Sequence, residues 1–541
     1  MPRDSGKTST TPLTVKQATF GLLRAFGIRK VFGNPGSTEL PFLSDWPEDI
    51  DYVLGLQEAS VIGMADGYAQ ATRNAGFVNL HSAAGVGNAL GNIFTAYRNQ
   101  TPLVISAGQQ ARSILPLQPF LFAERASEFP RPYVKFAIEP ARAEDVPAAI
   151  ARAYYTAMQP PCGPTFVSVP SDDWTKPAQP IEARSVTREL SPDPDAIRGL
   201  AEALAASERP AFVVGPGVDR AQAVDLMVRL AEKTRASVWV SPFSARCSFP
   251  ERHPQFAGHL HASPGQLSEA LRGHDLVVVI GAPVFTFHVE GDAAIFDGTT
   301  TLFQITDDPE AAAVTPAGTS IIATMKPALA ALIEMTGETT RAMPKGRVLP
   351  SAPAASDPIK AEFLLHSLSS AMPDDAVLVE EAPSHRPTMH QFMPMAGADS
   401  FYTMASGGLG HGLPAAVGIA LGRPNVRTVC LVGDGSAMYS IQALWSAAQR
   451  QLPLTVIVVN NEGYGAMRAF SQVMQVRSVP GLDMPGIDFV KIAEGMGCEA
   501  ARVTKSSELA GAFKRGLAHK GTSLVEVTVD SAVPVLYERR S

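Results

Sequence analysis

A chain of 541 residues with 45% hydrophobic and 18% charged residues is long enough for about three or four domains, each with a core of its own. A net charge of -7 gives no electrostatic reason to expect nucleic acid or an anionic membrane as a partner. The cysteines lie far apart, at Cys162, Cys247, Cys430 and Cys498, without C-x-x-C spacing; this argues against a disulfide framework and a zinc site and favours a reducing cytoplasm.

The sequence begins with the polar stretch "MPRDSGKTSTTPLT", and no apolar run of signal-peptide or transmembrane length follows. We expect a loose N-terminal arm, and neither secretion nor membrane insertion. Beyond it, one pattern recurs: a short apolar run, then Gly or Pro, then an amphipathic helical stretch. The apolar runs are, in chain order, "FVNLH", "TPLVISAG", "PAFVVGPGVD", "ASVWVSPF", "DLVVVIGAP", "TTLFQITDD", "DAVLVEEAPS", "RTVCLVGDGS" and "LTVIVVNN". The helix that follows "FVNLH" is expected to begin after Gly87.

Two stretches dense in Pro, Ser and charge, residues 171–195 and 337–360, are expected to be linkers. Alternating strands and helices with nearly continuous apolar strands predict parallel sheets covered by helices on both faces. The expected fold class is therefore α/β, with doubly wound parallel-sheet domains over residues 12–180, 195–340 and 358–535. Ligands of such sheets bind beyond the carboxyl ends of the strands, so residues directly after each strand are the candidates for a site.

Asp434 stands at such a place, directly after the apolar run "TVCLVG". The glycines on either side, Gly433 and Gly435, leave the backbone free to approach a ligand closely. Ser436 then precedes a helical stretch, and a helix N-terminus with free N–H groups is a site for phosphate. A lone carboxylate beside a diphosphate is the usual way to hold Mg²⁺, which completes its coordination with phosphate and water.

Asn461 ends the neighbouring strand and supplies a neutral oxygen that can join the same ion, with the backbone carbonyl of Gly463 as a third ligand. Either fragment alone is more simply a turn or a loop, because short motifs match by chance. Together, GDG on one strand and NN on the next resemble the pattern of thiamine-diphosphate enzymes. Such enzymes use a Glu to assist loss of the cofactor's C2 proton. Glu58, which ends an apolar strand in "DYVLGLQEASVIGMADGYAQAT", fits that role, although a helix-start carboxylate is also favoured by the helix dipole.

The chain resembles the benzoylformate decarboxylase family over nearly its whole length, segment by segment and in the same order. The segments are "GNPGSTELPFL", "ADGYAQAT", "NLHSAAGVGNALGN", "AGQQAR", "GHDLVVVIGAPVF", "SGGLGHGLPAAVG", "VGDGSAMYSIQALWSAAQ" and "VPGLDMPGIDF". The resemblance implies a pyrimidine-binding domain, a central Rossmann-like domain and a diphosphate-binding domain. It also implies thiamine diphosphate, Mg²⁺ or Ca²⁺, and a homotetramer with active sites at subunit interfaces.

The resemblance further implies roles for single residues. Ser37 corresponds to the serine that orients the substrate carboxylate, His81 to the histidine that handles the proton on the first adduct, and His288 to the histidine that protonates carbon after carbon dioxide leaves. Histidine suits both proton transfers. The cofactor-binding positions are Asn34, Pro35, Gly36, Pro383, Ser384, Gly407, Leu409, Gly433, Gly435, Ser436, Tyr464, Gly465 and Ala466. The substrate-pocket positions are Phe120, Leu121, Thr403, Met467 and Phe470.

Some positions depart from the family pattern. Thr403 replaces a Phe, Pro383 replaces a Thr in the diphosphate loop, and Glu462-Gly463 replaces Gly-Thr. A backbone carbonyl ligand survives the last change, whereas Thr403 places the identity of the 2-oxo acid in doubt. The central domain, with "GPGVD" at Gly215, resembles the decarboxylase version, so we predict no flavin (FAD).

The resulting hypothesis is a carboxy-lyase that converts a 2-oxo acid, such as benzoylformate, to an aldehyde and carbon dioxide. Two alternatives stay open. A carboligase or 2-hydroxyacyl lyase shares the fold, but having both His81 and His288 disfavours it. A non-catalytic thiamine-diphosphate-binding protein is the other alternative, and intact Glu58 and Asp434 argue against it.

Overall fold

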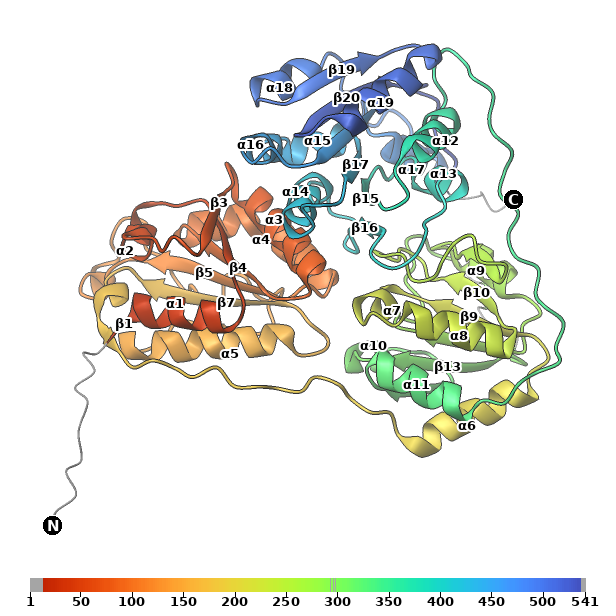
Figure 1. Cartoon of the computed structure of the whole chain (residues 1–541), viewed down its shortest axis with the longest axis horizontal. Coiled ribbons are helices and arrows are strands. Elements are labelled where there is room, and N and C mark those ends of the chain that lie inside the picture. Colours follow the sequence, from red (N-terminus) through yellow and green to blue (C-terminus); the bar gives the residue numbers. More distant parts are fainter. Residues whose placement is uncertain (1–12, 292, 295, 297, 537–541) are drawn as a thin grey trace. The chain divides into compact units, whose positions relative to one another are not determined.

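The computed structural model describes residues 13–291, 293–294, 296 and 298–536 of the chain (Figure 1). It divides into two compact units: unit 1 comprises Met1–Ala69 and Asn74–Val186, and unit 2 comprises Gln70–Arg73 and Thr187–Ser541. The expected N-terminal arm lies almost wholly outside the described residues.

Unit 1 is built on a six-stranded sheet with strand order β3-β2-β4-β5-β7-β6, in which all neighbours are parallel. Strands β1 and β8 pair antiparallel and form a separate two-stranded sheet. The strands are β1 (Leu13–Thr14), β2 (Lys30–Gly33), β3 (Asp51–Leu54), β4 (Gly76–Leu80), β5 (Leu103–Gln109), β6 (Ala137–Ile138), β7 (Pro164–Pro170) and β8 (Pro177–Ala178). The helices are α1 (Val15–Ala25), α2 (Leu40–Leu43), α3 (Glu58–Thr72), α4 (Ser82–Arg98) and α5 (Val146–Met158), with 3-10 turns η1 (Ser37–Glu39), η2 (Leu115–Leu117), η3 (Ala143–Asp145) and η4 (Asp173–Thr175).

Unit 2 contains two further six-stranded parallel sheets. The central one has the order β11-β10-β9-β12-β13-β14. Its strands are β9 (Pro210–Val214), β10 (Ser237–Val240), β11 (Phe256–His259), β12 (Leu276–Ile280), β13 (Thr301–Thr306) and β14 (Thr319–Ile322). Its helices are α6 (Pro194–Ala206), α7 (Pro216–Arg220), α8 (Val224–Thr234), α9 (Pro264–Leu271), α10 (Pro309–Ala313) and α11 (Met325–Met335).

The last sheet has the order β16-β15-β17-β18-β20-β19. Its strands are β15 (Val377–Glu381), β16 (Phe401–Thr403), β17 (Thr428–Gly433), β18 (Leu454–Asn460), β19 (Glu499–Val503) and β20 (Ser523–Thr528). Its helices are α12 (Ala361–Ala371), α13 (Arg386–Phe392), α14 (Gly412–Gly422), α15 (Asp434–Ser440), α16 (Ala443–Gln449), α17 (Gly465–Val473), α18 (Phe489–Gly495) and α19 (Leu509–Ala518), with the 3-10 turn η5 (Ser506–Glu508).

Strand β12 shows why the apolar runs are continuous. Leu276, Val278 and Ile280 pack into the core with α6, α8 and α11, whereas Val277 and Val279 pack into a second core with α9. Successive side chains point to opposite faces of a strand, so helices on both faces demand apolar residues at every position. This arrangement confirms the α/β fold with doubly wound parallel sheets.

Local signals in the sequence set several helix starts. Thr14 and Gln17 form a capping box at α1, in which each side chain accepts a bond from the other residue's backbone N–H. Asp193 caps α6, with Pro194 at the first helical position.

Two expected helix starts were wrong. Helix α4 begins at Ser82 and not after Gly87, because Gly85 and Gly87 lie inside the helix. Gly85 faces Glu58, where an added Cβ would stand 3.5 Å from the Glu58 Cγ. The helix expected after Ser436 begins earlier, at Asp434, and it is divided into the two helices α15 and α16.

Each six-stranded sheet falls within one of the expected ranges 12–180, 195–340 and 358–535, whose ends stay predictions. Residues 179–193 and 337–356, all described, contain no helix or strand, although the first expected linker also holds η4 and β8. Among the helices of the described residues, none is both long and apolar enough to cross a membrane.

Candidate active site

Asp434 lies at the carboxyl end of β17 and begins α15 in unit 2. Its carboxylate accepts bonds from the backbone N–H groups of Gly435 at 2.8 Å and Gly463 at 2.9 Å. The side chain is buried, and burial raises the pKa of this carboxyl above its usual value. A cation beside it would offset that cost, because it stabilises the charged form.

The loop after β18 brings Asn461 and Gly463 to this carboxylate. Asn461 is buried, and Glu462 and Gly463 have φ values of 55° and 158°, which turn the chain back. A Cβ on Gly463 would stand 2.3 Å from the carbonyl oxygen of Leu482, so only glycine fits there. The predicted metal ligands of unit 2 therefore lie together, with oxygen atoms of the type that Mg²⁺ prefers.

Several predicted cofactor-binding positions surround this point. A Cβ on Gly465 would meet Asn461 Nδ2 at 2.7 Å and Ser384 Oγ at 2.9 Å. A Cβ on Gly435 would meet the Tyr464 ring at 2.6 Å. Glycine at both positions therefore lets these side chains pack directly against the backbone beside the predicted metal ligands.

A buried carboxyl that the sequence argument missed holds the loop of Gly407 and Leu409. Glu381 ends β15, and its carboxylate accepts bonds from the backbone N–H groups of Gly410, at 2.6 Å, and Gly412. Burial raises the pKa of Glu381 to about 7. The charge of this loop anchor therefore changes near neutral pH.

Glu58 lies in unit 1, at the start of α3, and is 9% exposed. Its carboxylate accepts bonds from the side-chain amides of Asn34 at 3.1 Å and Asn88 at 3.0 Å. Asn34 was predicted to bind the cofactor, whereas Asn88 was missed because its only signal was a place on a helix. The two amides fix the direction of the carboxylate oxygens.

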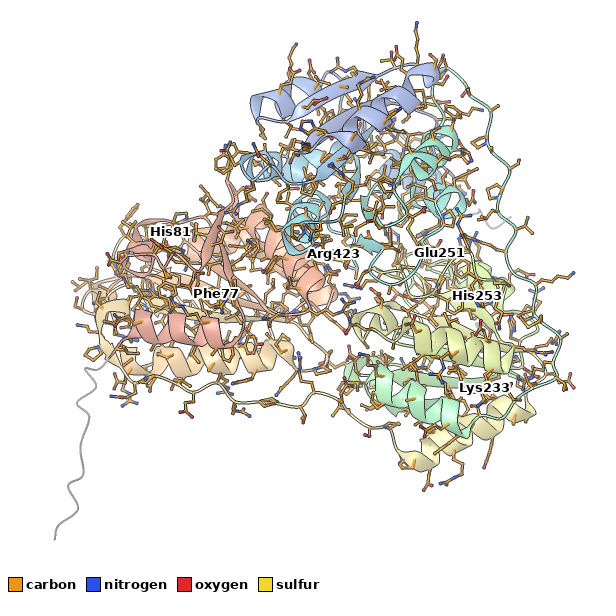
Figure 2. All side chains as sticks on the ribbon, in the orientation of Figure 1. Phe77, His81, Lys233, Glu251, His253 and Arg423 are labelled. Atoms are coloured by element: carbon orange, nitrogen blue, oxygen red, sulfur yellow. The ribbon has the colours of Figure 1, made fainter. Side chains whose placement is uncertain are left out.

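His81, labelled in Figure 2, follows β4, and its Nδ1 lies 2.8 Å from a carboxylate oxygen of Glu39. Glu39 is 1% exposed and also accepts the backbone N–H groups of Gly36 and Gly108, at 2.9 Å and 3.0 Å. A hydrogen bond at Nδ1 fixes the tautomer and leaves Nε2 available. The sequence argument missed Glu39, although its place three residues after Gly36 is the spacing of a capping box.

The remaining predicted positions of unit 1 are more open. Ser37 begins η1 and is exposed, between Gly36 and the buried Thr38. Phe120 is 87% exposed, and the carbonyl of Leu121 accepts a bond from the hydroxyl of Ser82.

In unit 2, His288 lies against Phe470, with ring centroids 4.7 Å apart, and against Phe243 at 5.7 Å. Partial burial lowers the pKa of His288 below its usual value. Phe470 lies on α17 with Met467, which is 50% exposed. A predicted proton donor and a predicted pocket residue are thus neighbours.

Thr403 ends β16 and is 2% exposed. Its hydroxyl donates to Glu380 and accepts a bond from Arg386 Nη2 at 2.9 Å. Arg386 Nε in turn donates to the Glu380 carboxylate at 2.7 Å. The hydroxyl of Thr403 therefore belongs to a buried polar network, and its role in the substrate pocket stays a prediction.

Comparison with known proteins agrees with this arrangement. Residues 13–125, 197–332 and 382–527 match, in that order, the N-terminal thiamine pyrophosphate (TPP) binding domain, the central domain and the C-terminal TPP binding domain of thiamine pyrophosphate enzymes. Thiamine pyrophosphate is another name for thiamine diphosphate. The fold and these three matches define a thiamine-diphosphate enzyme.

A benzoylformate decarboxylase of Pseudomonas aeruginosa is 43% identical over 96% of this chain and 100% of its own length. The crystal structure of benzoylformate decarboxylase from Polynucleobacter necessarius has a TM-score of 0.94 and 41% identity, covering 96% of this chain and 99% of that one. A thiamine diphosphate-dependent 4-hydroxybenzoylformate decarboxylase of Rhodococcus jostii RHA1 has a TM-score of 0.93 and 43% identity, covering 96% and 100%. The chain belongs to the benzoylformate decarboxylase family of thiamine-diphosphate-dependent decarboxylases.

Proposed function

We propose that this protein decarboxylates an aryl 2-oxo acid, such as benzoylformate, to an aldehyde and carbon dioxide. The observation that carries the proposal is the buried Asp434 carboxylate, which the backbone N–H groups of Gly435 and Gly463 hold beside Asn461. The substrate class rests on the names of the relatives, which act on benzoylformate and 4-hydroxybenzoylformate.

The residues present fit the cofactor and its metal. Asp434, Asn461 and the Gly463 carbonyl would hold Mg²⁺ or Ca²⁺, and glycine at positions 435 and 465 keeps the backbone close-packed beside them. When bound, thiamine diphosphate supplies the electron sink that decarboxylation needs.

The chain's own side chains supply orientation and protons. Glu58, held by Asn34 and Asn88, would exchange a proton with the aminopyrimidine ring of the cofactor. Ser37 would bind the substrate carboxylate. His81 would hold the proton at the substrate oxygen, and His288 would deliver one to the carbon that carbon dioxide has left.

The proposal also includes assembly and location. Glu58 lies in unit 1 and Asp434 in unit 2, and we expect each active site to combine unit 1 of one subunit with unit 2 of another in a homotetramer. A single chain should then be inactive. All four cysteines are free thiols, which suits a cytoplasmic enzyme. The proposed partners are the small-molecule substrate and further copies of the chain, and neither nucleic acid nor a membrane.

Glu39 is proposed to position His81. Replacing Glu39 by Gln should lower kcat by about 10- to 100-fold, the effect that groups supporting a functional histidine have in metal sites. KM should change little, because the substrate contacts remain. Steady-state kinetics of Glu39→Gln and Glu39→Asp checks this, with partial recovery expected for Asp, which keeps a carboxylate. Equal losses in both variants, accompanied by equal drops in Tm, would mean that Glu39 serves only the fold.

The proposed function is tested by removing the cofactor, restoring thiamine diphosphate with Mg²⁺, and measuring carbon dioxide and aldehyde from benzoylformate, 4-hydroxybenzoylformate and aliphatic 2-oxo acids. Cofactor-dependent aldehyde release, highest with an aryl acid, is expected. A preference for an aliphatic acid would keep the chemistry and refute the substrate class. Carbon–carbon coupling products in place of aldehyde would favour a carboligase, and cofactor binding without any turnover would favour a non-catalytic protein.

A further inference from the structure

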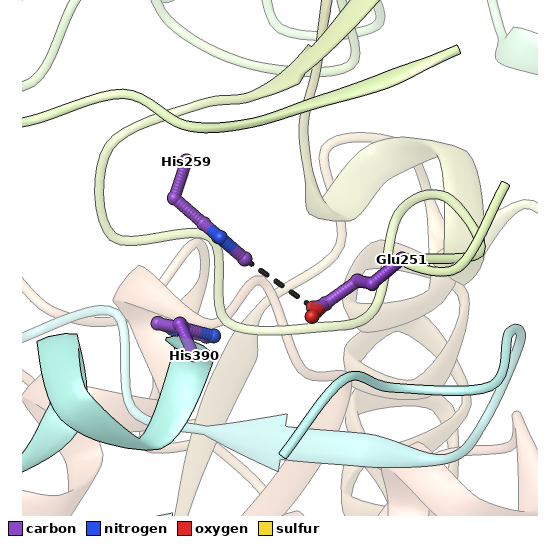
Figure 3. A group of neighbouring side chains, drawn as sticks. All are labelled: Glu251, His259 and His390. Atoms are coloured by element: carbon purple, nitrogen blue, oxygen red, sulfur yellow. Dashed lines mark ion pairs between the residues drawn. The ribbon is translucent and has the colours of Figure 1, made fainter. Parts of the chain in front are cut away.

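Glu251, His259 and His390 form a cluster in unit 2 that the proposed reaction does not use. Figure 3 shows their side chains converging from separate segments: the loop before β11, the last residue of β11, and helix α13. One carboxylate oxygen of Glu251 and one ring nitrogen of each histidine all lie within 4.8 Å of one another. From this convergence we propose that the cluster is a binding site for a divalent transition metal of the Zn²⁺ type.

The ligand types suit such an ion. Imidazole nitrogen and carboxylate oxygen are zinc ligands, and two histidines with one Glu is the ligand set of zinc sites that keep water in an open fourth position. His259 Nε2 already lies 3.3 Å from Glu251 Oε1, a separation typical of two ligands of one ion. The cysteine count could not reveal this site, because no cysteine takes part.

The ring nitrogen Nδ1 of His390 gives independent support for a bound ion. This atom is buried and, among the described residues, has no hydrogen-bond partner. A buried polar nitrogen without a partner destabilises the folded state, because it has lost its hydrogen bonds to water. A metal ion would remove that destabilisation. The ring of His390 stacks on that of His259, with centroids 3.8 Å apart and planes at 28°, so the rings must rotate somewhat to direct both nitrogens at one ion.

Arg347 supports the ligands without blocking them. Its Nη2 donates to Glu251 Oε2 at 3.2 Å, which leaves Oε1 on the side of His259. Its Nη1 donates to the backbone carbonyl of His390 at 2.7 Å. Arg347 thus fixes the positions of two ligands from outside, as hydrogen-bonded residues around metal sites commonly do.

A metal here would join the central sheet to the diphosphate-binding domain. His259 ends an edge strand of the central sheet, and α13 begins at Arg386, two residues after Ser384. Binding to the folded state alone raises stability, so the expected result of occupancy is a higher Tm. The proposal does not depend on the proposed function, and either can fail without the other.

The test is a Zn²⁺ titration of the holoenzyme, with thiamine diphosphate and Mg²⁺ at saturation to keep the cofactor site filled. Calorimetry and metal analysis should show a Zn²⁺ site whose affinity falls more than about 10-fold in His259→Gln and His390→Gln. His253→Gln is the matched control, because His253 also pairs with a carboxylate, Glu232 at 3.4 Å, outside the cluster. Zn²⁺ should raise Tm in the wild type and in this control only. Equal zinc affinity in all variants would refute the site.

A second measurement needs no variant. Crystals of the wild-type holoenzyme soaked in Zn²⁺ should give an anomalous difference peak between His259, His390 and Glu251. A peak only at Asp434, or none at all, would overturn the proposal.

Discussion

Glu58→Gln is expected to lower kcat on the order of 10²- to 10⁴-fold, the usual contribution of a positioned proton-transfer group. Glutamine keeps the size of the side chain and one oxygen to accept a bond from Asn34 or Asn88, but it cannot exchange a proton. Thiamine diphosphate should still bind, because the ligands of its metal lie elsewhere in the chain. Single-turnover kinetics with benzoylformate, beside cofactor titration, separates these two effects.

The control for this prediction is Glu48→Gln, which changes an exposed glutamate of the same unit. Its kcat should equal that of the wild type. A Glu58→Gln enzyme with more than about a tenth of wild-type kcat would rule out proton transfer by Glu58. A variant that also fails to bind the cofactor would point instead to a structural role for this carboxylate.

The fold was largely predictable because its strands are buried on both faces. In β12, β17 and β18 nearly every residue is apolar, so the sequence pattern of each strand differs from that of the amphipathic helices around it. Helix starts were harder to predict where glycines served packing instead of a turn. Gly85 and Gly87 indicated a late start for α4, but they lie inside the helix, and Gly85 lies on the face of the helix that contacts Glu58.

The closeness of the predicted metal ligands Asp434 and Asn461 could be foreseen because each follows directly after a parallel strand. Asp434 and Asn461 follow the neighbours β17 and β18, whose carboxyl ends meet at one edge of the sheet. Of the supporting residues, Glu39 follows no strand directly, and Glu381 was missed although it ends β15. Glu39 and Glu381 act through backbone N–H groups of other segments, Gly108 for the one and Gly410 for the other, and sequence spacing does not reveal such pairings.

The cluster of Glu251, His259 and His390 shows the same limit. His259 and His390 are separated by the second half of the central domain and the start of the diphosphate-binding domain, and no motif links them in the sequence. Thr403 illustrates a related difficulty: its position in the family pattern suggests a pocket wall, but the structure engages its hydroxyl with Glu380 and Arg386.

Asp434→Asn is expected to weaken binding of thiamine diphosphate in the presence of Mg²⁺ by more than about 100-fold, beyond the loss typical of supporting residues around a metal. The carboxylate offers both oxygens to backbone donors, Gly435 and Gly463, and still has lone pairs for an ion. An amide keeps one oxygen, and its NH₂ group would face one of those N–H donors. Both the charge and the loop that carries Asn461 and Gly463 are therefore disturbed.

Cofactor binding is measured by calorimetry over a range of Mg²⁺ concentrations, with Asp374→Asn, an exposed aspartate of the same unit, as the control. The control should bind as the wild type does. In Asp434→Asn, higher Mg²⁺ should not restore the affinity for thiamine diphosphate, because the substitution removes the carboxylate ligand of the metal. Recovery at high Mg²⁺ would mean that Asn461 and the Gly463 carbonyl suffice to hold the ion, and unchanged affinity at all concentrations would show that the cofactor is held without Asp434.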